Sequence, residues 1–279
     1  MSDDTGLDVE QIGMSENTGL DVERICAVMR PQARALLHSI SFQASTGSTQ
    51  SDALAAPTPT RGAAVYIADQ QTSGQGRRGR AWISPPAANL YLSATRCFAR
   101  PMSALSGLSV VTGIAIAESL RESGFAQVGV KWPNDLVAEG RKLGGVLIQL
   151  RAGTDSGAEA VIGIGLNVAM PALSAQQIDQ PWCDLSQLAL ATVPRNQLVS
   201  RLLDHLLPAL QLFEDESMAP FLARWTAVDA LAGKTVRMTQ SVGICEGIAA
   251  GITDAGALRV RTGAGEMNFQ GSEVSVRQV

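Results

Sequence analysis

A glycine-arginine segment, GQGRRGR at residues 74–80, constrains the fold of this chain more than any other feature. Its three glycines match the G-x-G-x-x-G spacing of a dinucleotide-binding turn, but that turn must open directly into a helix. Pro85 and Pro86 follow instead, and residues 89–98 alternate in polarity as a strand does. The segment therefore predicts a flexible loop leading to a strand, in which glycines admit a close ligand and guanidinium groups bind an anion. A basic surface turn without a ligand is the alternative.

A second motif, KWPND followed by GRKLGG, occupies residues 131–145. Lys142 stands beside a glycine pair, where its ammonium group offers a compact positive charge to a carboxylate or phosphate. Asn134 and Asp135 offer polar oxygens, and Mg²⁺ needs only one or two carboxylates beside phosphates, so Asp135 is a candidate metal ligand. Taken alone, Lys142 is a solvated turn residue; together with the arginine loop, it predicts a site for a nucleotide and an acid.

These two motifs, with Ser48, Thr49 and Gln50 before them and GIGLN at residues 163–167 after them, resemble the biotin protein ligase family. The resemblance runs from about Thr46 to the C-terminus. It implies an α+β fold, in which a class II tRNA-synthetase-like mixed sheet with helices is followed by a small SH3-like β-barrel. It also implies a reaction in which Mg²⁺ and ATP adenylate the carboxylate of biotin. The biotinyl group then passes to a lysine of the biotin carboxyl carrier protein of acetyl-CoA carboxylase.

The resemblance carries residue roles as well. It implies that Arg77 and Lys142 are catalytic. The biotin-binding residues that it implies are Ser48, Thr49, Gln50, Gln71, Gln75, Gly76, Arg77, Lys142 and Gly145. The ATP-binding residues that it implies are Arg77, Arg78, Trp82, Asn134, Lys142, Asn167, Trp182 and Arg277.

Local readings of some of these residues stay open. Ser48 or Thr49 is also a helix N-cap candidate, Asn167 also suits a strand end, and Trp182 also suits a core position. Many family members read G-R-G-R-R-G, whereas this chain has Gln75 in place of the first arginine. The loss of one charge-assisted hydrogen bond would weaken binding of ATP or the intermediate by about tenfold.

Apolar periodicity and turn residues predict the order of the elements. Helices are expected within residues 20–40, interrupted near Pro31, and at residues 51–56, 105–123 and 197–213. Strands are expected at residues 64–68, 89–98, 128–131, 143–151 and 160–167, and five short ones in the tail, at residues 235–238, 244–252, 257–261, 266–269 and 273–276. The predicted organisation is a disordered, repeat-containing N-terminus at residues 1–19, a catalytic domain at 20–229 and a barrel at 230–279.

Bulk properties exclude several classes of protein. The 279 residues, 46% of them hydrophobic, are enough for one large and one small domain. A net charge of −4 disfavours a binder of nucleic acid or anionic membranes, and the four cysteines are scattered without a C-x-x-C pair. Residues 101–117 are uncharged but too short and polar for a membrane span. We therefore expect a cytoplasmic enzyme that binds neither DNA nor membranes; family members often dimerise through the central sheet, which leaves a homodimer open.

Two other functions fit parts of the pattern. A lipoate or octanoate protein ligase would share the catalytic fold, although the R-R-x-x-G-G-G pattern typical of those families is absent. A non-catalytic biotin sensor would bind without turnover, and the retention of Arg77 and Lys142 argues against it. The acid used in adenylation separates the two kinds of ligase, and turnover separates a ligase from a sensor. The start codon, at Met1 or at Met14 in the second copy of a short repeat, stays undecided.

Overall fold

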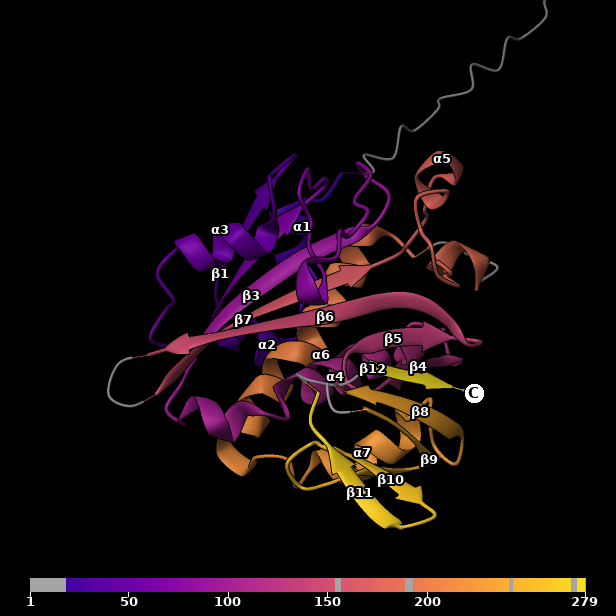
Figure 1. The fold of residues 1–279 in the computed structure, drawn as a ribbon. Coiled ribbons are helices and arrows are strands. Elements are labelled where there is room, and N and C mark those ends of the chain that lie inside the picture. Colours follow the sequence, from indigo (N-terminus) through magenta and orange to yellow (C-terminus); the bar gives the residue numbers. More distant parts are fainter. Residues whose placement is uncertain (1–18, 154–156, 189–192, 241–242, 272–274, 279) are drawn as a thin grey trace, which may run out of the picture.

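The computed structural model describes residues 19–153, 157–188, 193–240, 243–271 and 275–278. The expected disorder of the N-terminal repeat falls on residues 1–18, which lie outside the described residues. Two β-sheets form the framework (Figure 1). They divide the fold into a large α+β part and a smaller, C-terminal β part.

A seven-stranded mixed sheet with the order β1-β2-β3-β7-β6-β5-β4 forms the centre of the large part. Its first two strands are parallel and the other neighbours are antiparallel. The strands are β1 Leu37–Gln43, β2 Ala63–Ala68, β3 Leu90–Phe98, β4 Val128–Lys131, β5 Asp135–Ala138, β6 Arg141–Ala152 and β7 Ala158–Leu166. Alternation along β3 sends Leu92 into the apolar core and Ser93 toward the opposite face. The opposite face is the one that carries the site described below.

Helices cover the apolar face of this sheet. The long helix α6 packs on α4, and both contribute fully buried leucines to a core shared with the strands (Figure 1). Short α3 lies against β2, β3 and β7, and its Gln50 reaches the face that carries Ser93. The helices are α1 Val22–Ala27, α2 Pro31–Leu36, α3 Thr49–Ala55, α4 Leu108–Glu122, α5 Ala172–Ala175, α6 Arg195–Glu216 and α7 Phe221–Val228, with 3-10 turns at Arg77–Gly79, Met102–Leu105 and Leu185–Gln187.

The segment Met102–Glu122 is long and apolar enough to cross a membrane by length and composition. It consists of the 3-10 turn Met102–Leu105 and helix α4, and 72% of its most apolar stretch is buried inside the protein. Its apolarity is therefore used in packing against the sheet and α6.

Two strands, β1 and β5 (Asp135–Ala138), were not among the expected strands. Helical periodicity was expected to continue to Ile40, but the chain leaves α2 at Leu36 and enters strand β1 at Leu37. Pro31 also starts α2 rather than merely interrupting a helix, as its fixed φ and missing N–H favour at a first helical position. Parallel pairing with β2 stabilises β1 as a strand, and β2 lies more than twenty residues away in the sequence.

The C-terminal sheet has five strands in the order β11-β10-β9-β8-β12. They are β8 Thr235–Gln240, β9 Gly243–Ile252, β10 Leu258–Thr262, β11 Gly265–Phe269 and β12 Ser275–Gln278, all antiparallel to their neighbours. The turn between β9 and β10 contacts the larger part through two side-chain hydrogen bonds. Trp132 Nε1 donates to the carbonyl of Gly256 at 3.0 Å, and Ser106 Oγ donates to that of Ala255 at 3.0 Å.

Candidate functional site

A single cavity of about 850 Å³ gathers every residue that the sequence analysis singled out. It lies where α3, the arginine loop, the KWPND turn and the C-terminal strand meet the open face of the sheet. The predicted residues that line it are Ser48, Thr49, Gln50, Gln71, Gln75, Gly76, Arg77, Arg78, Trp82, Asn134, Asp135, Lys142, Gly145, Asn167, Trp182 and Arg277. These residues come together because the segments that carry them, although far apart in the sequence, lie at the ends of neighbouring strands of the sheet.

One end of the cavity is polar and buried. Ser48, Thr49 and Gln50 are 4%, 4% and 7% exposed. Ser48 occupies the N-cap position of α3 without making a side-chain capping bond, so its hydroxyl is free of that role. The Thr49 backbone N–H instead donates to Gln71 Oε1 at 3.0 Å, and Gln71 Nε2 donates to Ser84 Oγ at 3.1 Å. This end presents fixed hydrogen-bonding groups rather than an apolar wall.

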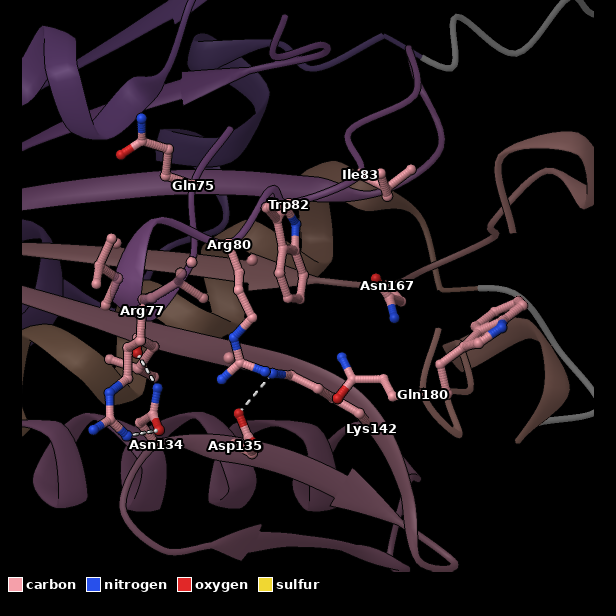
Figure 2. A pocket seen from close by; sticks show the side chains of 18 of the residues that line it. Gln75, Arg77, Arg80, Trp82, Ile83, Asn134, Asp135, Lys142, Asn167 and Gln180 are labelled. Carbon is pink, nitrogen blue, oxygen red and sulfur yellow. Dashed lines mark hydrogen bonds and ion pairs between the residues drawn. The ribbon is translucent and has the colours of Figure 1, made fainter. Parts of the chain in front are cut away.

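The arginine loop folds as a short 3-10 turn, Arg77–Gly79. Gly76 N donates to the Arg80 carbonyl at 2.7 Å, which closes the turn. Gly74 cannot be replaced without a shift, since a Cβ there would lie 2.8 Å from Gln71 Nε2. Gln75 points away from the cluster around Lys142 in Figure 2, so the departure from the family pattern lies at the edge of this group. The loop thus holds its basic side chains beside the cavity.

Arg77 joins three parts of the chain. Its Nη1 donates to Asn134 Oδ1 at 2.9 Å, and its Nη2 donates to the carbonyl of Gly271 in the C-terminal part. Asn134 in turn donates from Nδ2 to the Val146 carbonyl at 2.7 Å, which fixes its amide. Burial, and next the adjacent Arg78, lower the pKa of Arg77. The guanidinium is therefore held between the loop, the KWPND turn and the second sheet.

Lys142 occupies the centre of the other end of the cavity (Figure 2). Its Nζ lies 2.7 Å from Asp135 Oδ1 and 5.6 Å from the centre of the Trp82 ring. The indole can lie against strand β7 because Gly165 has no side chain; a Cβ there would lie 2.6 Å from the ring. Lysine, carboxylate and indole thus form one group at this end of the cavity.

Sequence reasoning missed two cations in this group. Lys131 and Arg80 both line the cavity, and Figure 2 shows Arg80 extending toward Lys142. Burial lowers the pKa of Lys131; among its charged neighbours, Asp135 opposes this shift and Lys142 adds to it. Lys131 stands in the KWPND motif and Arg80 in the arginine loop, so the signal was present in both motifs.

The last predicted residues close the cavity from two other segments. Asn167 is 4% exposed and donates from Nδ2 to the Cys183 carbonyl at 3.1 Å, so it anchors the following loop. Trp182 pairs with the Lys142 backbone through an isolated β-bridge, which places this loop beside the lysine. Arg277, on β12, is exposed and lines the same cavity.

Comparison with known proteins identifies the family of this chain. The model of the Biotin/lipoate A/B protein ligase family matches residues 40–167, and that of the Biotin protein ligase C terminal domain matches residues 232–277. The chain is 40% identical over 211 residues to the Bifunctional ligase/repressor BirA of Escherichia coli (strain K12), which covers 76% of this chain and 65% of the relative. The chain thus spans about two thirds of the length of that relative.

Two shorter relatives are matched over most of their length. A Biotin--[acetyl-CoA-carboxylase] ligase of Mycobacterium tuberculosis (strain ATCC 25618 / H37Rv) is 34% identical, covering 79% of this chain and 82% of the relative. One of Paracoccus denitrificans is 32% identical, covering 83% and 98%. The fold is similar to that of a biotin protein ligase from Aquifex aeolicus solved with biotin and ATP (TM-score 0.73, 24% identity, 87% of this chain and 100% of that chain). The chain therefore belongs to the biotin protein ligase family.

Proposed function

We propose that this protein is a biotin protein ligase, which adenylates biotin with ATP and transfers the biotinyl group to a lysine of a biotin carboxyl carrier protein. One observation carries the proposal: a single cavity joins a buried polar end to a cluster of four cations, Arg77, Arg80, Lys131 and Lys142. The polar end suits the cyclic urea of biotin, and the cations suit the carboxylate and the phosphates of ATP. The acetyl-CoA carboxylase named for the relatives suggests the source of the carrier.

The polar end argues against a lipoate or octanoate ligase. Neither a dithiolane nor an alkyl chain donates or accepts hydrogen bonds as a urea does. Either one would bring no hydrogen-bonding partner to the polar side chains of Thr49, Gln50 and Gln71, of which the first two are buried. A site built from such groups rejects an analogue that cannot pair with them, because each unpaired buried group costs about 1–3 kcal/mol.

The cationic end accounts for the chemistry of activation. A carboxylate oxygen of biotin attacks the α-phosphorus of ATP, a mixed anhydride forms and pyrophosphate leaves. The attack brings like charges together, and each close pair is worth about 4 kcal/mol at 4 Å for an effective dielectric constant near 20. Arg77 and Lys142 are placed to offset this repulsion, with Arg80 and Lys131 beside them. No protein nucleophile is required.

The residues present also fit a magnesium ion carried by the nucleotide. Mg²⁺ usually takes one or two carboxylates with substrate phosphates and water, and no group of three or more potential protein ligands occurs among the described residues. Asp135 is the residue that would hold it, since only one of its oxygens is engaged by Lys142 in the described contacts. When bound, the ion would neutralise phosphate charge.

Transfer completes the reaction. The neutral amine of a carrier lysine attacks the carbonyl carbon of the anhydride, the bond to the phosphate oxygen breaks, AMP leaves and the nitrogen releases one proton to solvent as the amide forms. The anhydride is prone to hydrolysis, so the arginine loop would have to exclude water until the lysine arrives. Its glycines allow such closure, and Arg77 would bind the phosphate of the intermediate.

The test is acid-dependent exchange of pyrophosphate into ATP by the purified protein with Mg²⁺, comparing biotin, lipoate and octanoate. Exchange with biotin alone supports the proposal, and transfer of labelled biotin to a carrier domain then tests the second step. Exchange with lipoate or octanoate instead would assign the chain to the related ligases. Binding of biotin without exchange would indicate a sensor.

A further inference from the structure

A line of buried side chains crosses the polar end of the cavity. Gln50 Nε2 donates to the Val161 carbonyl at 3.3 Å, and Ser93 Oγ donates to Gln50 Oε1 at 3.2 Å. The Thr49 hydroxyl lies 2.9 Å from Ser93 Oγ and 3.2 Å from Gln71 Oε1. Ser93 is 0% exposed and lines the cavity from β3, although the sequence gave no reason to select it.

Backbone groups fix the orientation of both glutamine amides. The Val161 carbonyl can only accept, so Gln50 turns its Nε2 toward it and its Oε1 toward Ser93. The Thr49 backbone N–H can only donate, so Gln71 turns its Oε1 toward it. The two hydroxyl groups therefore stand between two oxygen acceptors.

This arrangement has three short gaps between oxygens and only two hydroxyl protons to fill them. Ser93 is the one donor to the buried Gln50 Oε1 in the described contacts, so its proton is needed there. Gln71 Oε1 already accepts the backbone N–H of Thr49. The Thr49 proton then fills the shorter gap, to Ser93. The gap left without a proton is the one between Thr49 Oγ1 and Gln71 Oε1, two residues that line the cavity.

We propose that Ser93 is a specificity-determining positioning residue, which keeps this pair of acceptors open so that the site requires an acid whose buried end carries an N–H group. Two acceptors that face each other without a proton repel, and an N–H donor from the ligand relieves that repulsion. The inference rests on the function proposed above and names the chemical group that is recognised. The urea of biotin supplies N–H donors, whereas lipoate and octanoate have none.

The test replaces Ser93 with alanine and measures pyrophosphate exchange. Without the serine, the Thr49 proton turns to Gln71 Oε1 and closes the gap. The KM for biotin should rise about tenfold, the effect of one hydrogen bond, while kcat and the KM for ATP stay unchanged. Biotin methylated on either ureido nitrogen is then tested as a competitor. The unsubstituted protein should bind one isomer more weakly, because in that isomer a methyl group replaces the N–H that faces the gap. The inhibition constant of this isomer should be the same for Ser93→Ala as for the unsubstituted protein.

A second variant should place a proton in the same gap by a different change. Gln50→Met removes the acceptor that commits the Ser93 proton, so this proton can turn to Thr49 and the Thr49 proton to Gln71. It should raise the KM for biotin in the same direction. Thr95→Val is the matched control: Thr95 lies two residues further along β3 on the same face, fully buried, and its hydroxyl has no hydrogen-bond partner among the described residues. It should leave both constants unchanged.

The possible results of these experiments distinguish a failure of the Ser93 proposal from a failure of the proposed function. An equal loss of affinity for biotin and for the methylated isomer in Ser93→Ala would mean that the hydroxyl acts through packing, and the proposal fails. An unchanged KM for biotin in that variant overturns it as well. Absence of biotin-dependent exchange in the unsubstituted protein would overturn the proposed function itself, and this inference with it.

Discussion

At the scale of single residues, the charge of Lys131 gives the cavity a pH dependence. Burial lowers the pKa of this lysine below its usual range, and Lys142, Arg277 and Arg80 add to the effect while Asp135 opposes it. A lysine with a lowered pKa loses its charge at a lower pH than a free one. The KM for ATP should therefore begin to rise below the ordinary titration range of lysine, near pH 10.4. Lys131→Arg should shift this rise to higher pH, and identical pH profiles would contradict the role of Lys131.

Arg77 gives a second prediction at this scale. In Arg77→Gly, exchange should remain measurable, but the mixed anhydride should escape about ten- to hundredfold faster, because a charge-assisted hydrogen bond to its phosphate is lost. The measurement is biotinylation of bystander lysines in an added protein. Arg61→Gly is the control, since Arg61 is exposed and does not line the cavity. Unchanged release and labelling in Arg77→Gly would remove Arg77 from this role.

At the scale of elements, strand β7 divides the cavity into its two ends. Gly163 and Gly165 point to the same face; a Cβ on the first would lie 2.5 Å from Gln50 Oε1, and one on the second 2.6 Å from Trp82. Gly163→Ala should raise the KM for biotin by about tenfold or more through displacement of the amide, and Gly165→Ala should do the same for ATP through displacement of the indole. Each variant is the control for the other. Equal effects of both variants on both substrates would show that the strand does not separate the ends.

At the scale of the whole molecule, the C-terminal sheet completes the cavity only while it stays docked. Gly256 has a φ of +77°, and a Cβ there would lie 2.9 Å from Gly107 Cα. Gly256→Ala should lower the free energy of unfolding by about 1–2 kcal/mol from its backbone alone, and should raise the KM for ATP because the contact of Arg77 with Gly271 is disturbed. Gly251→Ala is the control, since Gly251 has a φ of +88° with no atom within 4 Å of its Cβ position. Urea unfolding and exchange measure both effects, and equal KM values in the two variants would contradict the coupling.

Short-range patterns were sufficient for much of the fold. The two prolines after the arginine loop ruled out a helix there, and alternation marked β3. Glycine-bounded runs marked all five strands of the tail. The two motifs also marked most of the cavity, because loops that bind anions need glycines and cations that are close together in the sequence. Such signals need no knowledge of what lies across the fold.

The tertiary structure determined the features that the sequence analysis missed, and the physical reason is the same for each of them. Strand β1 exists because β2 is beside it, and local periodicity could not reveal a partner so distant in the sequence. Ser93 matters because Gln50 and Thr49 approach it from a helix more than forty residues away. The sequence by itself determined which residue types form the loops and strands and which charges they carry. Only the packed sheet decided which of those residues meet, since hydrogen bonds and burial depend on distance in space.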